Sequence, residues 1–221
     1  INNWNETRKD RIQETMLLKS LQRDLKSDIK NINIRLDRKR AMLKGFTNCL
    51  HILAGKKEGN KEEFMKSYER IMQVDALSLN ATTFNNLQNN GELKLIKNKI
   101  LADSIVAYYN SDLSGWQTSL RDYSRNNFAP YILNYDFLPE VAFDFSNLDN
   151  ELRDYYEELP ANDEFLVSDK SLEEFKSNVF IINMLKFKSR NVIGLIREYK
   201  KLSDYARKLD ISIQNEIKNN D

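Results

Sequence analysis

The sequence holds one histidine and one cysteine, two residue types that often serve as nucleophile, base or metal ligand. His51 follows Cys49 by two positions, and positions two apart on an α-helix are separated by roughly 200°. The two side chains therefore face different sides of a helix and cannot form a Cys-His pair. We interpret His51 as a packed or exposed bystander, because such sites need several converging groups.

Other signatures of catalysis are missing from the sequence. It contains no glycine-rich phosphate loop, no HExxH or GxSxG motif and no calcium-loop spacing. A single cysteine also leaves no internal disulfide and no CxxC pair. Acid-base chemistry would have to rest on scattered carboxylates without visible partners. We therefore predict that the protein is not an enzyme and has no cofactor and no metal site.

A run of basic residues in the first quarter of the chain is the strongest candidate for binding nucleic acid. Its members are Arg35, Arg38, Lys39, Arg40 and Lys44. The residues between them include no aromatic side chain on which a base could stack. We favour a solvated helix face and keep a nucleic-acid-binding adaptor as the alternative.

A group of acidic residues lies near the prolines and could attract a hard cation. The group comprises Asp144, Asp149, Glu151, Asp154, Glu157 and Glu158. The spacing lacks the Asp/Asn alternation and the turn glycine of a calcium loop. A solvated helix is the better interpretation.

Aromatic residues concentrate in the middle of the chain, from Phe84 to Tyr135. Tyr108, Tyr109 and Trp116 are the residues that we expect at a recognition surface, if the protein has one. Core packing is the competing interpretation, because these residues recur at helical spacing.

The composition limits the architecture that can position these residues. The chain has 221 residues, a mean hydropathy of -0.64 and 30% charged residues, which favours an elongated helical body over a thick core. Lys+Arg 34 and Asp+Glu 33 give a net charge of +1. No global field attracts polyanions, so any such binding must come from a local patch.

Both ends of the chain carry long helical patterns, because glycine and proline are rare there. In the first segment apolar residues recur in steps of three and four, with Lys39 as the one polar member. They are Leu18, Leu21, Leu25, Ile29, Ile32, Leu36, Leu43, Phe46, Leu50 and Leu53. In the last segment the stripe is Phe175, Val179, Ile182, Leu185, Val192, Ile196, Tyr199, Leu202, Ala206, Leu209, Ile213 and Ile217.

Each stripe is too narrow to be buried alone, so the two segments are expected to pair. We predict an all-α fold in which two long antiparallel terminal helices form a coiled-coil-like stalk with a helical insert between them. The predicted first helix covers 1–55, the insert 60–160 and the last helix 168–218, within a single all-helical unit over 1–221. A Ser171–Glu174 capping box would begin the last helix.

The insert is predicted to hold several shorter helices. One helix starts near Thr83 and ends at Gly91, which suits a left-handed C′ position. A longer helix runs from about Asn98 and stops before Pro130. The alternation of Tyr131, Leu133, Tyr135 and Phe137 suggests a brief strand.

The opening Ile1-Asn2-Asn3-Trp4-Asn5-Glu6, followed by Arg8, Lys9 and Arg11, resembles the segment after the membrane span in an uncharacterised family of bacterial single-pass membrane proteins. Further matching stretches are Phe84-x-x-Leu87-x-x-x-Gly91-x-Leu93-x-Leu95-Ile96-x-Asn98, then Tyr108-Tyr109-Asn110, and Leu166-x-x-Asp169 leading to Phe175 and Asn178.

The resemblance implies a membrane span upstream of residue 1, an inner-membrane location and a soluble domain that faces the periplasm. Trp4 would then lie at the membrane interface, as aromatic anchors do.

We expect a membrane-anchored extracytoplasmic interaction or sensing module without catalysis, with an unknown protein or small-molecule partner. The alternative is a soluble coiled-coil adaptor that binds nucleic acid or protein through a basic helix face. Nucleic acid is not the expected partner, and a homo-oligomer remains open.

Overall fold

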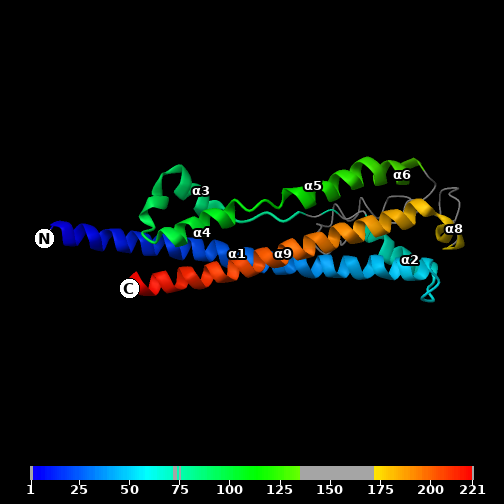
Figure 1. The fold of residues 1–221 in the computed structure, drawn as a ribbon, viewed down its shortest axis with the longest axis horizontal. Coiled ribbons are helices and arrows are strands. Elements are labelled where there is room, and N and C mark those ends of the chain that lie inside the picture. The colour runs from blue at the N-terminus through cyan, green and yellow to red at the C-terminus, as the bar shows by residue number, and fades with distance from the viewer. Residues whose placement is uncertain (1, 72–73, 75, 135–171, 221) are drawn as a thin grey trace, which may run out of the picture. The chain divides into compact units, whose positions relative to one another are not determined.

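A computed structural model describes residues 2–71, 74, 76–134 and 172–220. All regular secondary structure in these residues is helical. α1 (Asn2–Leu53) and α9 (Val179–Asn220) are long terminal helices that pack against each other, and a helical insert joins them, as the sequence predicted (Figure 1). The shorter helices are α2 (Lys61–Tyr68), η1 (Glu69–Ile71), α3 (Thr82–Asn89), η2 (Glu92–Leu95), α4 (Lys99–Tyr109), α5 (Ser114–Tyr123), η3 (Ser124–Phe128), α6 (Ala129–Asn134) and α8 (Leu172–Ser177).

The chain divides into two compact units. Unit 1 comprises Ile1–Lys39, Ala76–Gly115 and Gly194–Asp221, and unit 2 comprises Arg40–Asp75 and Trp116–Ile193. The prediction of a single all-helical unit over 1–221 stays a prediction.

Hydrogen bonds within unit 1 give the relative direction of the long helices. Ser203 of α9 donates to Asn33 of α1 over 3.5 Å. Glu14, earlier in α1, and Glu216, later in α9, both accept hydrogen bonds from the two residues that precede α4. Residue numbers rise along α1 in the direction in which they fall along α9, so the two helices are antiparallel.

Carboxylates of α1 hold the insert of unit 1 in place. Asp28 accepts hydrogen bonds from the Asn80 backbone N–H (2.7 Å) and the Tyr108 hydroxyl (3.2 Å). Asp24 accepts one from the Thr83 backbone N–H at 3.0 Å. Asp24 of α1 therefore caps the start of α3. Thr83, which the sequence predicted as the cap, donates its backbone N–H to Asp24, and its side chain does not act as the cap.

Unit 2 is built around an aromatic cluster that joins α2 to later segments. The ring of Phe64 lies 5.5 Å from that of Tyr68 and 5.3 Å from that of Phe175. Phe128 meets Tyr68 edge-on at 6.3 Å. All four side chains are buried, so they form the core of this unit.

Asparagine side chains cap three helices. Asn60 accepts a hydrogen bond from the third backbone N–H of α2 at 2.8 Å. Asn98 does the same for α4 at 3.1 Å, and Asn178 for α9 at 3.2 Å. Each cap satisfies a backbone donor that has no partner inside its helix.

The buried stripe of α1 agrees with the prediction in its first half and departs from it later. Leu18, Leu21, Leu25, Ile32 and Leu36 are buried, and so is the predicted polar member Lys39, whereas the predicted member Ile29 is only half-buried. Beyond Lys39 the buried apolar residues are Met42, Phe46, Cys49, Ile52 and Leu53, whereas Leu43 and Leu50 are only half-buried. Here α1 packs on α2, since Cys49 Sγ donates to the Phe64 carbonyl oxygen and Gly45 lies against Ser67.

The predicted long helix from Asn98 to Pro130 is wrong in two respects. It breaks after Tyr109, where residues 110–113 separate α4 from α5. It also continues past Pro130, which is the second residue of α6 and follows directly on a preceding helical segment. A π-helical segment, η3, joins α5 to α6.

Two smaller predictions also need correction. Tyr131 and Leu133 lie in α6 and not in a strand, while Tyr135 and Phe137 fall outside the described residues. The last helix is interrupted at Asn178, which separates α8 from α9. Val179 of its predicted stripe is 66% exposed. Ser171 of the expected capping box lies outside the described residues.

Candidate functional site

Unit 2 carries an open groove of about 800 Å³ between α1 and the segment formed by α2 and η1. One wall is a single face of α1, and the other comes from residues 57–70. The lining residues are Arg40, Ala41, Leu43, Lys44, Gly45, Thr47, Asn48, His51, Lys57, Glu63, Ser67 and Arg70. Five of these side chains are basic or histidine and one is acidic, so the groove is a local cationic site in a nearly neutral chain.

The end of α1 turns the chain back to form the second wall. Gly55 has φ +66 and follows the last helical turn, and Lys56 N donates to His51 O at 2.9 Å. Gly55 N also donates to Ile52 O at 3.0 Å, which completes a Schellman motif. Glycine is needed at this position because other L-residues rarely adopt positive φ.

Gly45 lies where the end of α2 packs on α1. A methyl group placed on Gly45 would lie 3.5 Å from the Ser67 carbonyl oxygen and 3.6 Å from Cδ of Arg70. The α2 backbone therefore passes directly over this glycine. These distances are ordinary van der Waals contacts, so a methyl group would fit against α2 and η1 at this position.

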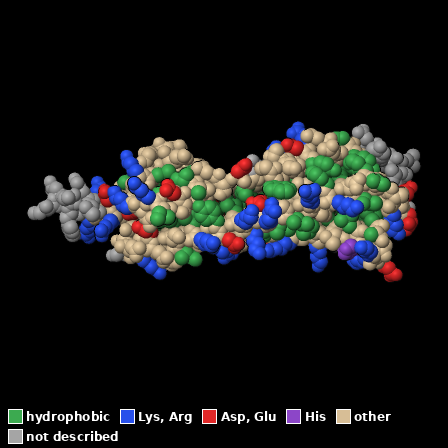
Figure 2. Space-filling model, viewed as in Figure 1, with side chains coloured by type: hydrophobic (Ala, Val, Ile, Leu, Met, Phe, Trp, Pro, Cys, Tyr) green, Lys and Arg blue, Asp and Glu red, His purple; other side chains and the backbone are tan. Residues whose placement is uncertain are grey.

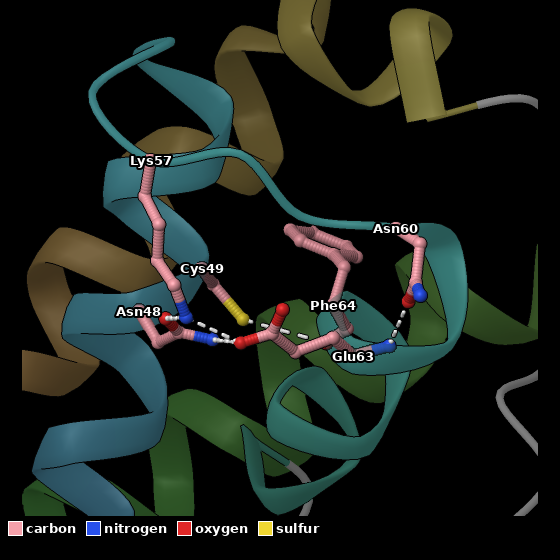
Figure 3. A network of polar contacts seen from close by, with 6 residues as sticks. All are labelled: Asn48, Cys49, Lys57, Asn60, Glu63 and Phe64. Carbon is pink, nitrogen blue, oxygen red and sulfur yellow. Dashed lines mark hydrogen bonds and ion pairs between the residues drawn. The ribbon is translucent and has the colours of Figure 1, made fainter.

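One end of the groove holds a polar network, shown in Figure 3. Glu63 forms an ion pair with Lys57 and accepts a hydrogen bond from Asn48 Nδ2 at 3.2 Å. Lys57 Nζ also donates to Asn48 Oδ1 at 2.6 Å. Hydrogen bonds from Lys57 and then Asn48 lower the pKa of Glu63, so this carboxylate stays ionised in the groove.

Two further cations of the groove are not neutralised in this way. Among the side chains that the structure describes, Lys44 and Arg70 form no ion pair. Lys44 and His51 are exposed, and Arg70 is half-buried. Figure 2 shows the single histidine at the surface with lysine or arginine side chains beside it. The groove therefore presents positive charge to solvent.

Cys49 lies behind the groove and takes no part in it. Its side chain is fully buried, and Sγ donates to the Phe64 carbonyl oxygen at 3.5 Å. Burial raises the pKa of the Cys49 thiol to about 12, so the thiol is protonated at neutral pH. Cys49 and His51 are thus separated, one inside and one outside, as expected from their spacing.

The predicted recognition residues fall in different units. Tyr108 and Tyr109 belong to unit 1, and Trp116 belongs to unit 2. Tyr108 is fully buried and binds Asp28, and burial raises the pKa of its hydroxyl. Tyr109 is half-buried and stacks on Phe84 with ring centroids 4.9 Å apart.

Tyr108 therefore has a structural role. Trp116 is half-buried, and none of these three aromatics lines the groove. A recognition role for Tyr109 and Trp116 stays a prediction.

The basic run separates into members with different surroundings. Arg38, Arg40 and Lys44 are exposed, Arg35 is half-buried and Lys39 is buried. Only Arg40 and Lys44 line the groove. Two other predictions cannot be placed: the side chain of Trp4 and the acidic group Asp144–Glu158 lie outside the described residues.

Sequence reasoning missed Asn48, Lys57, Glu63 and Arg70, which complete the groove. Asn48 lies on α1 itself. Lys57, Glu63 and Arg70 come from a turn, from α2 and from η1, and nothing in the pattern of α1 shows that these elements fold back onto it. The interior position of Gly45 was the available signal, because it marks the place where the end of α2 packs on α1.

Comparisons with known proteins give no match to a family model, a curated protein or a solved structure. Among the described helices, none has an apolar stretch long enough to cross a membrane. Likewise, among the described side chains, no three His, Cys, Asp or Glu gather where they could hold a metal ion.

Proposed function

We propose that the protein is a non-catalytic interaction module that binds an anionic partner through the groove of unit 2. The observation that carries this proposal is the set of cations on two facing walls, above all Lys44 on α1 and Arg70 on η1. Like charges side by side cost free energy unless an anion neutralises them. A ligand with negative charge would relieve that repulsion.

The chemistry of the groove favours binding over catalysis. Its one carboxylate, Glu63, is held by Lys57 and Asn48. The neighbouring thiol of Cys49 is buried and protonated. Thr47 and Ser67 supply hydroxyls to the lining. In the part of the chain that the structure describes, His51 is hydrogen-bonded neither to these hydroxyls nor to Glu63, so no nucleophile–base pair is assembled.

For the cellular location, we propose a membrane anchor that would place this domain in the periplasm. The support is the resemblance of the opening Ile1–Glu6 segment and the basic residues after it. The test is fractionation of the natural protein expressed from its own gene. It should pellet with inner membranes and be cleaved by protease added to spheroplasts; recovery in the soluble fraction would contradict the anchor.

Binding is tested with the 221-residue chain and three fluorescent polyanions: polyglutamate, polyphosphate and oligo(dT). We expect at least one to bind, and binding to fall in a Lys44→Ala/Arg70→Ala double variant. The matched control is Lys186→Ala/Arg190→Ala, which removes two exposed cations of unit 2 that do not line the groove. Equal binding by both double variants would contradict a role for the groove.

A further inference from the structure

The charges in the groove are spread along its length and are not gathered at one point. Arg40, Lys44 and His51 follow one face of α1, and the rise of about 1.5 Å per residue spaces the first and last by roughly 16 Å. An extended peptide covers that distance in about five residues at about 3.3 Å each. A single small anion would contact only part of this face.

The groove already binds one carboxylate. Glu63 is held by the ammonium group of Lys57 and by the side-chain amide of Asn48, both within hydrogen-bonding distance. Both members of the Lys57–Glu63 pair are partly exposed, with 44% and 43% of their side chains accessible. An incoming carboxylate can therefore reach the same Lys57.

The remaining lining residues distinguish between kinds of polyanion. Leu43 and Ala41 give apolar contact area, which suits a peptide and not an inorganic chain of phosphates. Thr47 and Ser67 offer hydroxyls for backbone groups of a bound peptide. No lining residue is Phe, Tyr or Trp, and the imidazole of His51 is the single ring in the lining on which a base could stack. The groove therefore lacks the series of stacking platforms that single-stranded nucleic acid uses.

We propose that the groove of unit 2 binds an extended acidic peptide segment of a partner protein. Lys44 and Arg70 bind side-chain carboxylates of this segment, while Glu63 competes with the segment for Lys57. The inference rests on the proposed function, and it adds the class of ligand and a residue that limits affinity.

The experiment measures fluorescence anisotropy of a labelled hexapeptide with four glutamates and two leucines. Its control is the same peptide with glutamine in place of glutamate. The 221-residue chain should bind the acidic peptide and not the glutamine peptide. Affinity should fall about tenfold in Lys44→Ala/Arg70→Ala and stay within twofold in Lys186→Ala/Arg190→Ala.

Glu63→Gln supplies the sharper test, because the proposal predicts tighter binding. Loss of the competing carboxylate frees Lys57, and affinity should rise about threefold or more at low salt. Slow alkylation of Cys49, whose Sγ contacts the Phe64 carbonyl of α2, verifies that α2 stays packed. If alkylation is fast, Glu63→Asp, which shortens the competing side chain, replaces Glu63→Gln and should also bind more tightly. Weaker binding by a folded Glu63 variant would overturn the competition.

The outcomes separate this inference from the proposed function. Groove-dependent binding of polyphosphate or oligo(dT) without binding of the acidic peptide would contradict the proposed peptide ligand. The proposed function, an anion-binding module, would then still stand. If no polyanion depends on Lys44 and Arg70, both the peptide and the proposed function fail.

Discussion

α1 uses its charged residues in opposite ways in the two units. In unit 1 the carboxylates of Glu14, Asp24 and Asp28 accept hydrogen bonds from backbone N–H groups of the insert. In unit 2 the cations Arg40 and Lys44 line an open groove. The carboxylates of unit 1 are thus hydrogen-bonded to the protein's own backbone, whereas Arg40 and Lys44 of unit 2 are exposed to solvent.

This difference distinguishes charges that hold the fold from charges available to a ligand. A carboxylate that accepts backbone hydrogen bonds stabilises a particular arrangement, because losing it leaves buried donors without partners. A cation at an exposed position adds little to stability. Substitutions in the two units should therefore have unequal effects on the free energy of unfolding.

The largest effect is expected for Leu25→Asp in unit 1. Leu25 is 1% exposed, so the new carboxylate would be buried among apolar side chains. The cost should be about 4 kcal/mol, measured by urea unfolding. The neighbouring exposed position gives the control, since Ser27→Asp adds the same charge in solvent. Similar losses in the two variants would mean that Leu25 is not part of a core.

Asp28→Ala is expected to have the next largest effect. It leaves the Asn80 N–H and the Tyr108 hydroxyl without their acceptor, at a cost of about 2 kcal/mol. Asp28→Asn should cost far less, because an amide can accept from Asn80 and donate to Tyr108. Equal destabilisation by both variants would contradict the hydrogen-bond explanation.

The same pair of variants predicts a pH dependence. Burial raises the pKa of Asp28, and hydrogen bonds from Asn80 and Tyr108 offset this only in part. Since the unfolded chain loses this proton at lower pH than the folded chain, the contribution of Asp28 to stability falls as pH rises from about 3.8 through the native pKa. Relative to the natural protein, Asp28→Asn should gain stability over that window in urea titrations.

Asp24→Ala tests the cap of α3 and should cost about 1 kcal/mol, as the loss of other helix caps does. Asp24 accepts from the Thr83 N–H at 3.0 Å and from Asn80 Nδ2 at 3.1 Å. Hydrogen exchange at Thr83 should accelerate in this variant. Unchanged exchange would show that the cap is not needed.

The smallest effect is expected for Lys44→Ala in the groove. Its side chain is exposed, so the free energy of unfolding should change by less than about 0.5 kcal/mol. A loss of unfolding free energy as large as that in Asp24→Ala would contradict the difference between the units, since Lys44 would then stabilise the fold as Asp24 does.

The sequence predicts the helical framework better than the polar contacts that position the insert. Stripes such as Leu18 to Leu36 follow from periodicity alone, because hydrophobic burial depends on spacing along one helix. The left-handed glycine after α3, Gly91 with φ +67, was also predictable from its chemistry. Asp28 was not, because its partners are 52 and 80 positions away.

The groove shows the same limit. Arg40 and Lys44 were recognised as a basic run on one helix, and the run was interpreted as a solvated face. The sequence could not assign Arg70 to the same site as this run, since the position of Arg70 depends on the turn at Gly55 and on the packing of η1 near Gly45. The buried Lys39 was visible as a polar residue in an apolar stripe.

The buried thiol gives unit 2 a property that can be followed in time. Because Cys49 Sγ contacts the Phe64 carbonyl of α2, an alkylating reagent can reach it only when α2 separates from α1. If reclosing is fast compared with alkylation, the labelling rate equals the equilibrium constant for this local opening multiplied by the rate for a free thiol. A ligand that spans the groove would lower that rate without touching the cysteine. The single thiol thus makes the equilibrium between the closed and the open groove a measurable quantity.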